Sequence, residues 1–281
     1  MEFLVHEYSQ LLTFIGVGLL AQMVDGGIGM GYGIFSNSVL LSLGIPPSIS
    51  SGAVHTAEVF TTGFSSFFHW KEKNVERKLF FHLLIPGIFG ALIGSVILIF
   101  FYSSVIKPII TGYLFILGFL ILRKSFHKIQ EENAYHFFPF RILHHLTVKL
   151  SKVIFPYGES IPAIFIKFLG IIAGILDAIG GGGWGPVTTS TLIAKDHNPR
   201  YTIGTVNAVE FFVTLTTSLS ILFAFGLDGW QIIVGLLIGG LIASPISAKI
   251  CRYIQPRFLM LIVGILIILM SGWNFGLWIM Q

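Results

Sequence analysis

Four acidic residues stand inside apolar stretches of this chain, in two matched pairs. Asp25 and Asp177 each open a glycine-rich run, and Glu58 and Glu210 lie in the long apolar stretches that follow. Within each pair the second residue follows the first by 152 positions. A carboxyl group at membrane depth is costly, so each is a functional hypothesis by default. The two aspartates could cap backbone N–H groups of the turns or take up protons, and the sequence leaves both roles open.

The glycine runs have the features of an anion site built without basic side chains. Glycine permits tight turns and leaves backbone N–H groups accessible, and a helix N-terminus offers free donors and about half a positive charge. Two helices beginning near Gly31 and Gly183 would present such ends to one another. Small residues could instead serve only close helix packing, but the duplication and the nearby hydroxyl groups favour a site. The candidate substrate-binding residues are Gly29, Gly31, Tyr32, Gly33, Ser36, Asn37, His55, Gly181, Gly183, Trp184, Gly185, Thr188, Thr189 and Asn207.

The glutamates lie on polar stripes of two long apolar segments. Glu58 and Glu210 are the candidates for coupling transport to protons, although a polar stripe can also hold helices together through hydrogen bonds. His55 precedes Glu58 by three residues, about one helical turn, so the two side chains could share a proton or a hydrogen bond. Asn207 stands at the position equivalent to His55 in the second copy, so the pocket need not be symmetric.

The offset of 152 residues extends well beyond the glycine runs. Across residues 18–66, 15 of 49 positions are identical to the residue 152 positions later, where chance matching in so biased a composition would give roughly a tenth. We therefore expect two copies of one unit, 1–125 and 161–281, joined by a connector at 126–160. Within the connector, Arg141–Phe155 has apolar residues at helical spacing, which predicts an amphipathic helix on the inner leaflet. A plain linker is the simpler alternative.

The composition identifies a polytopic, all-α membrane protein. Of the 281 residues, 54% are hydrophobic and 11% charged, whereas soluble domains carry about 25% charged residues; the mean hydropathy is +0.85. The single cysteine excludes an internal disulfide and a zinc pattern, and the sequence has neither a Walker phosphate loop nor an HExxH motif. We expect no metal and no cofactor. The net charge of +4 does not indicate nucleic-acid binding.

Long and short apolar segments follow one another in the same order in both halves. A membrane span takes about 20 residues, and six segments approach that length: Ser50–Trp70, Leu79–Tyr102, Val105–Leu122, Thr202–Phe225, Gly229–Ala248 and Phe258–Met280. Four are shorter: Tyr8–Val24, Gly31–Leu43, Pro162–Leu176 and Gly183–Ala194. Each half is thus expected to contain a short broken-helix pair and three spanning helices. A re-entrant hairpin is favoured over two broken full spans, because Gly31–Leu43 reaches only about 20 Å of a core of about 30 Å.

The basic residues predict opposite orientations for the two halves. If the first short pair enters from outside and the second from inside, every Lys and Arg except Lys107 falls on the cytoplasmic side, as the positive-inside rule favours. The halves then form inverted-topology repeats, an architecture of secondary transporters whose sites lie near the midplane. We expect a multi-pass protein of the cell (inner) membrane, with both termini outside and the connector cytoplasmic.

The doubled motif resembles that of the TauE/SafE sulfite exporter family, in the 4-toluene sulfonate uptake permease superfamily. The resemblance rests on Gln22–Gly31, on its echo Leu176–Pro186 and on the segments that contain Glu58 and Glu210. It covers nearly the whole chain and implies a permease for a sulfur-containing anion such as sulfite, sulfoacetate, another organosulfonate or thiosulfate. Exporters and importers both occur in this family, so the direction stays open. The positions carried over as pocket residues are Asp25–Gly33 and Asp177–Pro186.

These inferences predict a secondary transporter, not an enzyme, that binds a small sulfur-containing anion at the midplane between the two glycine-rich tips. A passive anion channel, which needs no coupling carboxyl group, is the alternative. An intramembrane aspartyl protease also has two aspartates, but Asp25 and Asp177 hold equivalent positions before glycine runs, which argues against that class. The expected partners are the small anion and the lipid bilayer, with no nucleic acid. The coupling ion and the oligomeric state, a homodimer included, stay open.

Overall fold

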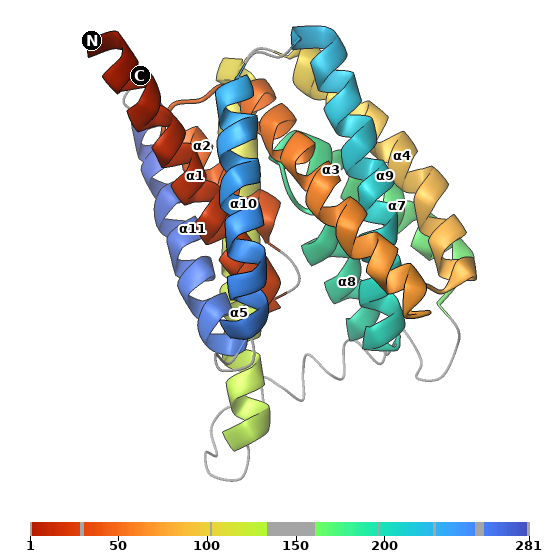
Figure 1. Cartoon of the computed structure of the whole chain (residues 1–281). Helices are drawn as coiled ribbons and strands as arrows, with labels where there is room; N and C mark the ends of the chain where they lie inside the picture. The colour runs from red at the N-terminus through yellow and green to blue at the C-terminus, as the bar shows by residue number, and fades with distance from the viewer. Residues whose placement is uncertain are drawn as a thin grey trace.

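The computed structural model of the chain is all-helical (Figure 1), as the composition predicted. It describes residues 2–28, 31–101, 103–133, 161–195, 197–226, 229–250 and 256–279. The helices within these residues are α1 (Glu2–Ile28), α2 (Tyr32–Ser42), α3 (Pro47–Lys71), α4 (Arg77–Phe100), α5 (Ser103–Asn133), α7 (Ala163–Gly180), α8 (Trp184–Ala194), α9 (Pro199–Phe225), α10 (Trp230–Ile250) and α11 (Pro256–Ile279).

The helices differ in whether they can cross a membrane. Among the described residues, α4 and α7 and most of α5 and α9 are long and apolar enough to do so by length and composition. Helices α2 and α8 have eleven residues each, and at 1.5 Å per residue each reaches about 16 Å, roughly half the hydrocarbon thickness. Helices α1 and α7 have 27 and 18 residues. Both are longer than the segments expected at Tyr8–Val24 and Pro162–Leu176. Each helix continues through its aspartate to the glycines, and α1 also begins earlier, at Glu2.

Some sequence predictions lie outside the described residues. These are the amphipathic helix at Arg141–Phe155, most of the connector at 126–160, and the pocket residue Gly29. Helix α5 continues to Asn133, beyond residue 125, where the first unit was expected to end.

Glycine sets the two helix breaks, because the chain turns there through backbone conformations that other residues rarely adopt. Gly181 has φ 65° as the left-handed C-cap of α7, and its N–H donates to the Asp177 carbonyl oxygen at 2.8 Å. Gly182 has φ 150°, and Gly31, directly before α2, has φ 132°. A residue with a Cβ would be strained at each of these three positions.

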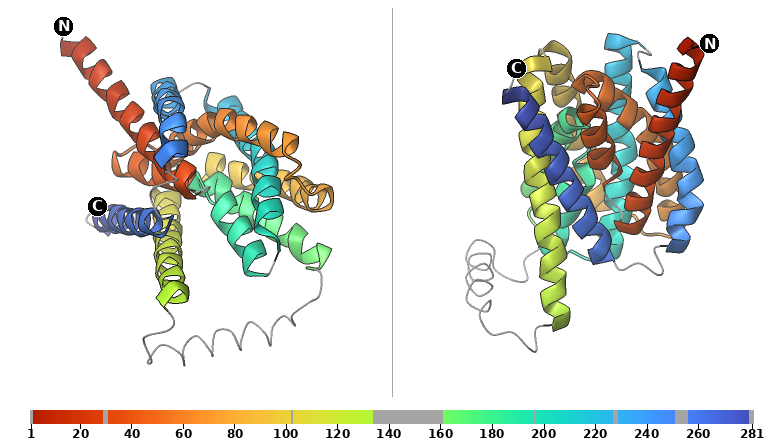
Figure 2. Two further views of the ribbon diagram at one scale, coloured as in Figure 1. Left: turned by 60° about the horizontal axis from the view of Figure 1, so that its bottom comes forward. Right: turned by 90° about the vertical axis from the view of Figure 1, so that its left-hand side faces the viewer.

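Helices from opposite halves of the chain lie side by side. Helix α1 packs along α10 and α4 along α7, while α3 lies against α9 and α5 against α11 (Figures 1 and 2). The short helix α2 contacts α1, α3 and α11, and α8 contacts α7 and α9. Both chain termini lie at the top of Figure 1, and the C-terminal ends of α5, α8 and α10 lie at the bottom. The glycine breaks are therefore enclosed by helices from both halves.

Glycine also sets how closely the paired helices approach. A Cβ on Gly90 of α4 would lie 2.3 Å from the Ile171 carbonyl oxygen of α7. In the pair of α1 and α10, a Cβ on Gly239 would lie 2.1 Å from the Ile15 carbonyl oxygen. Small residues allow this approach in membranes, where lipid supplies no hydrophobic force between helices.

We expect Gly90→Ala to destabilise the protein by about 1–3 kcal/mol, the usual effect of overpacking a close-fitting interior. The added methyl group would meet backbone atoms, which cannot move aside as a side chain can. Gly112 in α5 is a matched control, because a Cβ there has no neighbour within 4 Å. The midpoint of thermal unfolding in detergent should fall for Gly90→Ala and stay at or above the wild-type value for Gly112→Ala. Equal midpoints would contradict the packing described.

Candidate functional site

The two glycine breaks meet inside the molecule, backbone against backbone. A Cβ on Gly33 of α2 would lie 2.5 Å from the Gly181 carbonyl oxygen and 2.8 Å from the Cα of Gly182. From the other side, a Cβ on Gly182 would lie 2.3 Å from the backbone nitrogen of Ile34. The start of α2 therefore rests directly on the turn between α7 and α8.

One amide ties three helices together at this meeting point. The Asn37 side-chain amide of α2 donates to the carbonyl oxygen of Gly180, the last residue of α7. The Ser50 hydroxyl of α3 donates to the Asn37 amide oxygen. Both side chains are buried. The sequence indicated Asn37 as a substrate contact, but in the structure its amide nitrogen donates to, and its amide oxygen accepts from, other residues of the chain.

The first N–H group of each short helix is satisfied by an aspartate of the same half. The Trp184 N–H, the first of α8, donates to Asp177 Oδ1 with an N···O distance of 2.9 Å. The Tyr32 N–H, the first of α2, hydrogen-bonds the Asp25 carboxyl group. A carboxylate in this position accepts from donors that have no partner within the helix, and the helix dipole favours it. Each aspartate therefore occupies a capping position.

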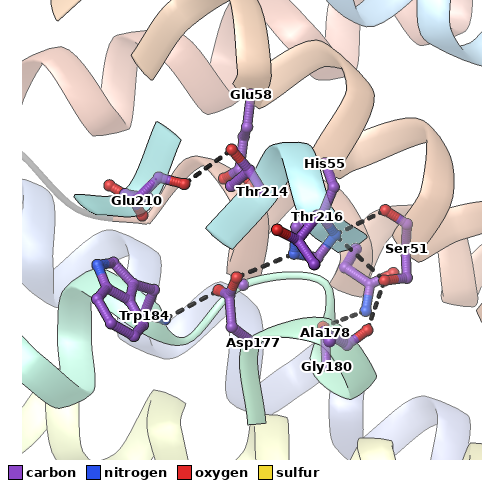
Figure 3. A network of polar contacts seen from close by, with 12 residues as sticks. Ser51, His55, Glu58, Asp177, Ala178, Gly180, Trp184, Glu210, Thr214 and Thr216 are labelled. Carbon is purple, nitrogen blue, oxygen red and sulfur yellow. Dashed lines mark hydrogen bonds and ion pairs between the residues drawn. The ribbon is translucent and has the colours of Figure 1, made fainter. Parts of the chain in front are cut away.

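A buried polar cluster joins α3 to the α7–α8 break (Figure 3). His55 Nε2 lies 3.0 Å from Asp177 Oδ2, and His55 Nδ1 lies 2.8 Å from the Ser51 carbonyl oxygen. The Ser51 hydroxyl donates to the Ala178 carbonyl oxygen at 2.7 Å. His55 is 0% exposed and Asp177 2%, so bulk water does not reach the pair. The sequence suggested Glu58 as the partner of His55, but both ring nitrogens contact other groups.

The two glutamates come from α3 and α9, which lie side by side (Figure 3). The Gly33 N–H hydrogen-bonds the Glu58 carboxyl group, which is buried, and Oε2 of that group has no hydrogen-bond partner among the described residues. Glu210 is only partly buried. Glu58 lies within electrostatic range of Glu210, Asp177 and Asp25. Four carboxyl groups from both halves therefore share one region, where like charges repel strongly because the dielectric constant is low.

The rest of the polar stripes on α3 and α9 forms interhelical hydrogen bonds. Thr56 Oγ1 lies 2.8 Å from Ser218 Oγ, and the Ser66 hydroxyl donates to the Asn207 carbonyl oxygen at 3.0 Å. The side-chain oxygen Oδ1 of Asn207 is buried without a hydrogen-bond partner among the described residues. The stripes thus hold the two helices together, while Asn207 Oδ1 and the glutamates contribute unpaired polar atoms.

The rings of Tyr32 and Trp184 point into two different hydrophobic clusters. The Tyr32 hydroxyl donates to the Leu236 carbonyl oxygen of α10 at 3.1 Å. The Trp184 Nε1–H donates to the Val206 carbonyl oxygen of α9 at 3.0 Å, and its ring edge contacts Gly87 of α4. These residues therefore contribute their backbone N–H groups to the break, not a ring that closes it.

The predicted hydroxyl groups near the breaks differ in their hydrogen bonding. Ser36 is fully buried, and its Oγ has no partner among the described residues. The Thr188 hydroxyl donates to the Trp184 carbonyl oxygen of its own helix, and Thr189 is buried in the same turn. Gly183 and Gly185 are buried beside them. Ser36 is thus the hydroxyl group with free hydrogen-bonding capacity.

Two members of the cluster were missed by the sequence analysis. Ser51 precedes His55 by four residues, so an i, i+4 polar pair on α3 was the available signal. Tyr113 of α5 donates to the Gly182 carbonyl oxygen at 3.4 Å, and a Cβ on Gly183 would lie 2.0 Å from its hydroxyl oxygen. No spacing in the sequence connects α5 with the glycine runs.

The charges around the breaks limit what the region can bind. Among the residues whose burial the structure describes, no Lys or Arg is buried. Within the described residues, no group of three His, Cys, Asp or Glu side chains could hold a metal ion. An anion here would be held by backbone N–H, hydroxyl and amide donors, next to carboxyl groups that repel it unless they are neutralised.

We expect Asn37→Ala to destabilise the protein by about 1–3 kcal/mol, because it leaves the buried Gly180 carbonyl oxygen without its donor. The neighbouring Ser36→Ala is the control: it removes a buried hydroxyl group that has no partner among the described residues, so stability should stay level or rise slightly. Thermal unfolding in detergent measures both. A larger loss for Ser36→Ala than for Asn37→Ala would contradict the hydrogen bonding described here.

Comparison with known proteins gives a consistent result over nearly the whole chain. The family model described as "Sulfite exporter TauE/SafE" matches residues 14–273. A similar curated protein is the "Probable membrane transporter protein YtnM" of Bacillus subtilis (strain 168), which is 37% identical over 268 residues, covering 94% of this chain and 82% of the relative. No solved structure matches the chain.

Proposed function

The chain belongs to the sulfite exporter TauE/SafE family of membrane transporters, and we propose that it is a secondary transporter for a small sulfur-containing anion such as sulfite, sulfoacetate or another organosulfonate. The observation that carries this proposal is the contact between the start of α2 and the α7–α8 turn. Two buried helix starts in one place supply backbone donors that a small oxyanion can use. The family is one of transporters, so no enzymatic reaction is assigned to the chain.

We propose that the halves form inverted-topology repeats, 1–125 and 161–281, with 126–160 as the connector. Helices α2 and α8 start 152 residues apart, as do α3 and α9, and this equals the offset of the sequence repeat. In the second copy, α7 is the equivalent of α1 and α10 is the equivalent of α4. Helix α1 packs along α10, and in the same way α7 packs along α4. Because α2 and α8 are too short to span a bilayer, we propose that each of them starts at its glycine break near the midplane and leaves toward one side.

We propose that the protein lies in the cell (inner) membrane with both termini outside and the connector in the cytoplasm. The termini lie at one end of the molecule, while the C-terminal ends of α3, α8 and α10 lie at the opposite end (Figure 1). Lys and Arg residues gather near those latter ends in the sequence, which favours placing them in the cytoplasm.

In the proposed site, the substrate anion takes the place of the carboxylates of the chain itself. The carboxyl groups of the two aspartates occupy the first N–H groups of α2 and α8. A substrate anion can use these donors only when the carboxyl groups release them, and a protonated carboxyl group is a weaker acceptor than a carboxylate. We assign the substrate oxygens to N–H groups within Gly31–Gly33 and Gly181–Gly185, with Ser36 and Asn207 as nearby polar side chains. Transport coupled to protons follows from this exchange, with Glu58 and Glu210 in the proton path.

Sulfite or methanesulfonate should stabilise the detergent-solubilised protein against heat. A ligand that binds only the folded state stabilises it by about 2.7 kcal/mol when its concentration is 100 times the dissociation constant. The measurement is the unfolding midpoint across a panel of sulfite, thiosulfate, methanesulfonate, sulfoacetate and chloride at constant ionic strength. A midpoint that no sulfur anion raises above the chloride value would overturn the proposed substrate class.

A coupled transporter differs from a passive anion channel in its need for the buried glutamates. In proteoliposomes with an imposed pH gradient, Glu58→Gln and Glu210→Gln should reduce accumulation of the anion at least tenfold, because an amide cannot carry a proton between the two sides. Unchanged flux in both variants, together with no accumulation by the wild type, would identify a channel instead.

A further inference from the structure

We propose that the buried pair of His55 and Asp177 holds one exchangeable proton, and that the substrate anion crosses the membrane together with this proton in an electroneutral symport. The inference rests on the proposed function and adds the number of protons that accompany each anion and the residue pair that holds them.

Counting hydrogen bonds determines the tautomer of His55. The Ser51 hydroxyl has a single hydrogen, which it donates to the Ala178 carbonyl oxygen 2.7 Å away. The Ser51 carbonyl oxygen lies 2.8 Å from His55 Nδ1 and can only accept a hydrogen bond. Nδ1 therefore carries a hydrogen, which the lone pairs of Ser51 Oγ, 3.2 Å away, can share.

The other ring nitrogen then shares a proton with Asp177. His55 Nε2 lies 3.0 Å from Asp177 Oδ2, and with Nδ1 protonated a hydrogen bond at this distance requires one more proton, on either atom. The pair is then an imidazolium with a carboxylate or a neutral imidazole with a carboxylic acid. Both forms have no net charge. Loss of the proton leaves a bare nitrogen lone pair facing a carboxylate at 0% and 2% exposure, an arrangement that repels across the contact between α3 and α7.

The pair is placed where it can respond to a bound anion. The second oxygen of Asp177 accepts the first N–H of α8, which is one of the donors assigned to the substrate. When the pair is protonated, it is neutral and Asp177 can release this donor. When the proton leaves, Asp177 holds the donor and places a negative charge beside the anion. Anion binding and protonation therefore favour each other, and thermodynamic linkage makes the effect reciprocal.

Other titratable groups face this region from five helices. They are Asp25 on α1, Tyr32 on α2, Glu58 on α3, Tyr113 on α5 and Glu210 on α9. Glu58 lies one helical turn from His55, and its Oε2 has no hydrogen-bond partner among the described residues. The proton released by the pair passes to this oxygen and from there to water on the side to which the site is open.

The two halves of the chain differ at this pair, and the difference sets the stoichiometry. Asn207 stands 152 positions after His55, and an asparagine amide does not titrate. The described residues therefore hold one histidine–aspartate pair at the glycine breaks, and one proton accompanies each singly charged anion.

The transport test uses methanesulfonate, whose charge does not change across the pH range, with the full chain in proteoliposomes. A pH gradient should drive its accumulation, whereas a membrane potential alone should not, because the transported pair is neutral. In His55→Asn, which places the residue of the second copy in the first, the ratio of gradient-driven accumulation to methanesulfonate exchange should fall at least tenfold. His82→Asn is the matched control: His82 is partly exposed on α4, and its Nδ1 lies 2.7 Å from the Lys78 carbonyl oxygen of the same helix. Its ratio should match the wild type.

Two outcomes of the transport test would overturn the symport: accumulation driven by membrane potential in the wild type, or an unchanged ratio in His55→Asn. Absence of any exchange by the wild type, with every sulfur anion of the panel, would instead overturn the proposed substrate class.

A spectroscopic test of the pair does not depend on transport. With ¹⁵N-labelled histidine in nanodiscs, the His55 signals are those missing from the His55→Asn spectrum. They should show a protonated Nδ1 at every pH at which the protein is folded, and Asp177→Asn should shift the Nε2 signal. A bare Nδ1 with a protonated Nε2 would overturn the assignment, and His55→Gln replaces His55→Asn for the subtraction if that variant does not fold.

Discussion

A helix that starts inside a membrane exposes backbone N–H groups that lipid cannot satisfy, and this chain meets that constraint with its own carboxyl groups. Trp184 N–H bonds Asp177, and Tyr32 N–H bonds Asp25. Unsatisfied backbone groups at membrane depth cost several kcal/mol each. Each short helix therefore needs an acceptor for its first N–H group, and an aspartate supplies it. The costly carboxyl groups and the costly helix breaks thus compensate one another, which explains why they occur together.

The same constraint connects the fold to transport. A helix start that already binds a carboxylate is an anion site with an occupant, and a substrate anion competes with that occupant for the same donors. Protonation weakens the occupant and removes the repulsion, so an anion and a proton that arrive together meet less resistance than either does alone. His55 of α3 is a second partner for Asp177, with Nε2 and Oδ2 3.0 Å apart. The protonation of Asp177 at the α7–α8 break therefore affects a contact with α3. Under the proposed mechanism, a region with several carboxyl groups can in this way bind an anion, although no Lys or Arg is buried among the residues whose burial the structure describes.

Much of the fold could be predicted from the sequence, because membrane spans depend on local hydropathy. The long segments correspond to α3, α4, α5, α9, α10 and α11, and the short segments after the glycine runs correspond to α2 and α8. The partner of His55 could not be predicted, because Asp177 comes from the other half of the chain and helix periodicity reports only neighbours on the same helix. For the same reason Tyr113 was missed. The rings of Tyr32 and Trp184 were expected at the site, but each hydrogen-bonds a carbonyl group of a neighbouring helix that no sequence spacing identifies.

The central claim is that the substrate anion replaces the chain's own carboxyl groups at the two buried helix starts. A structure of the full chain in nanodiscs with bound methanesulfonate tests it most directly. The account predicts density for the anion within hydrogen-bonding distance of the backbone N–H groups of Trp184 or Tyr32, with the corresponding Asp177 or Asp25 carboxyl group moved off that donor. Anion density elsewhere in the molecule, with both carboxyl groups still bonded to these N–H groups, would contradict it.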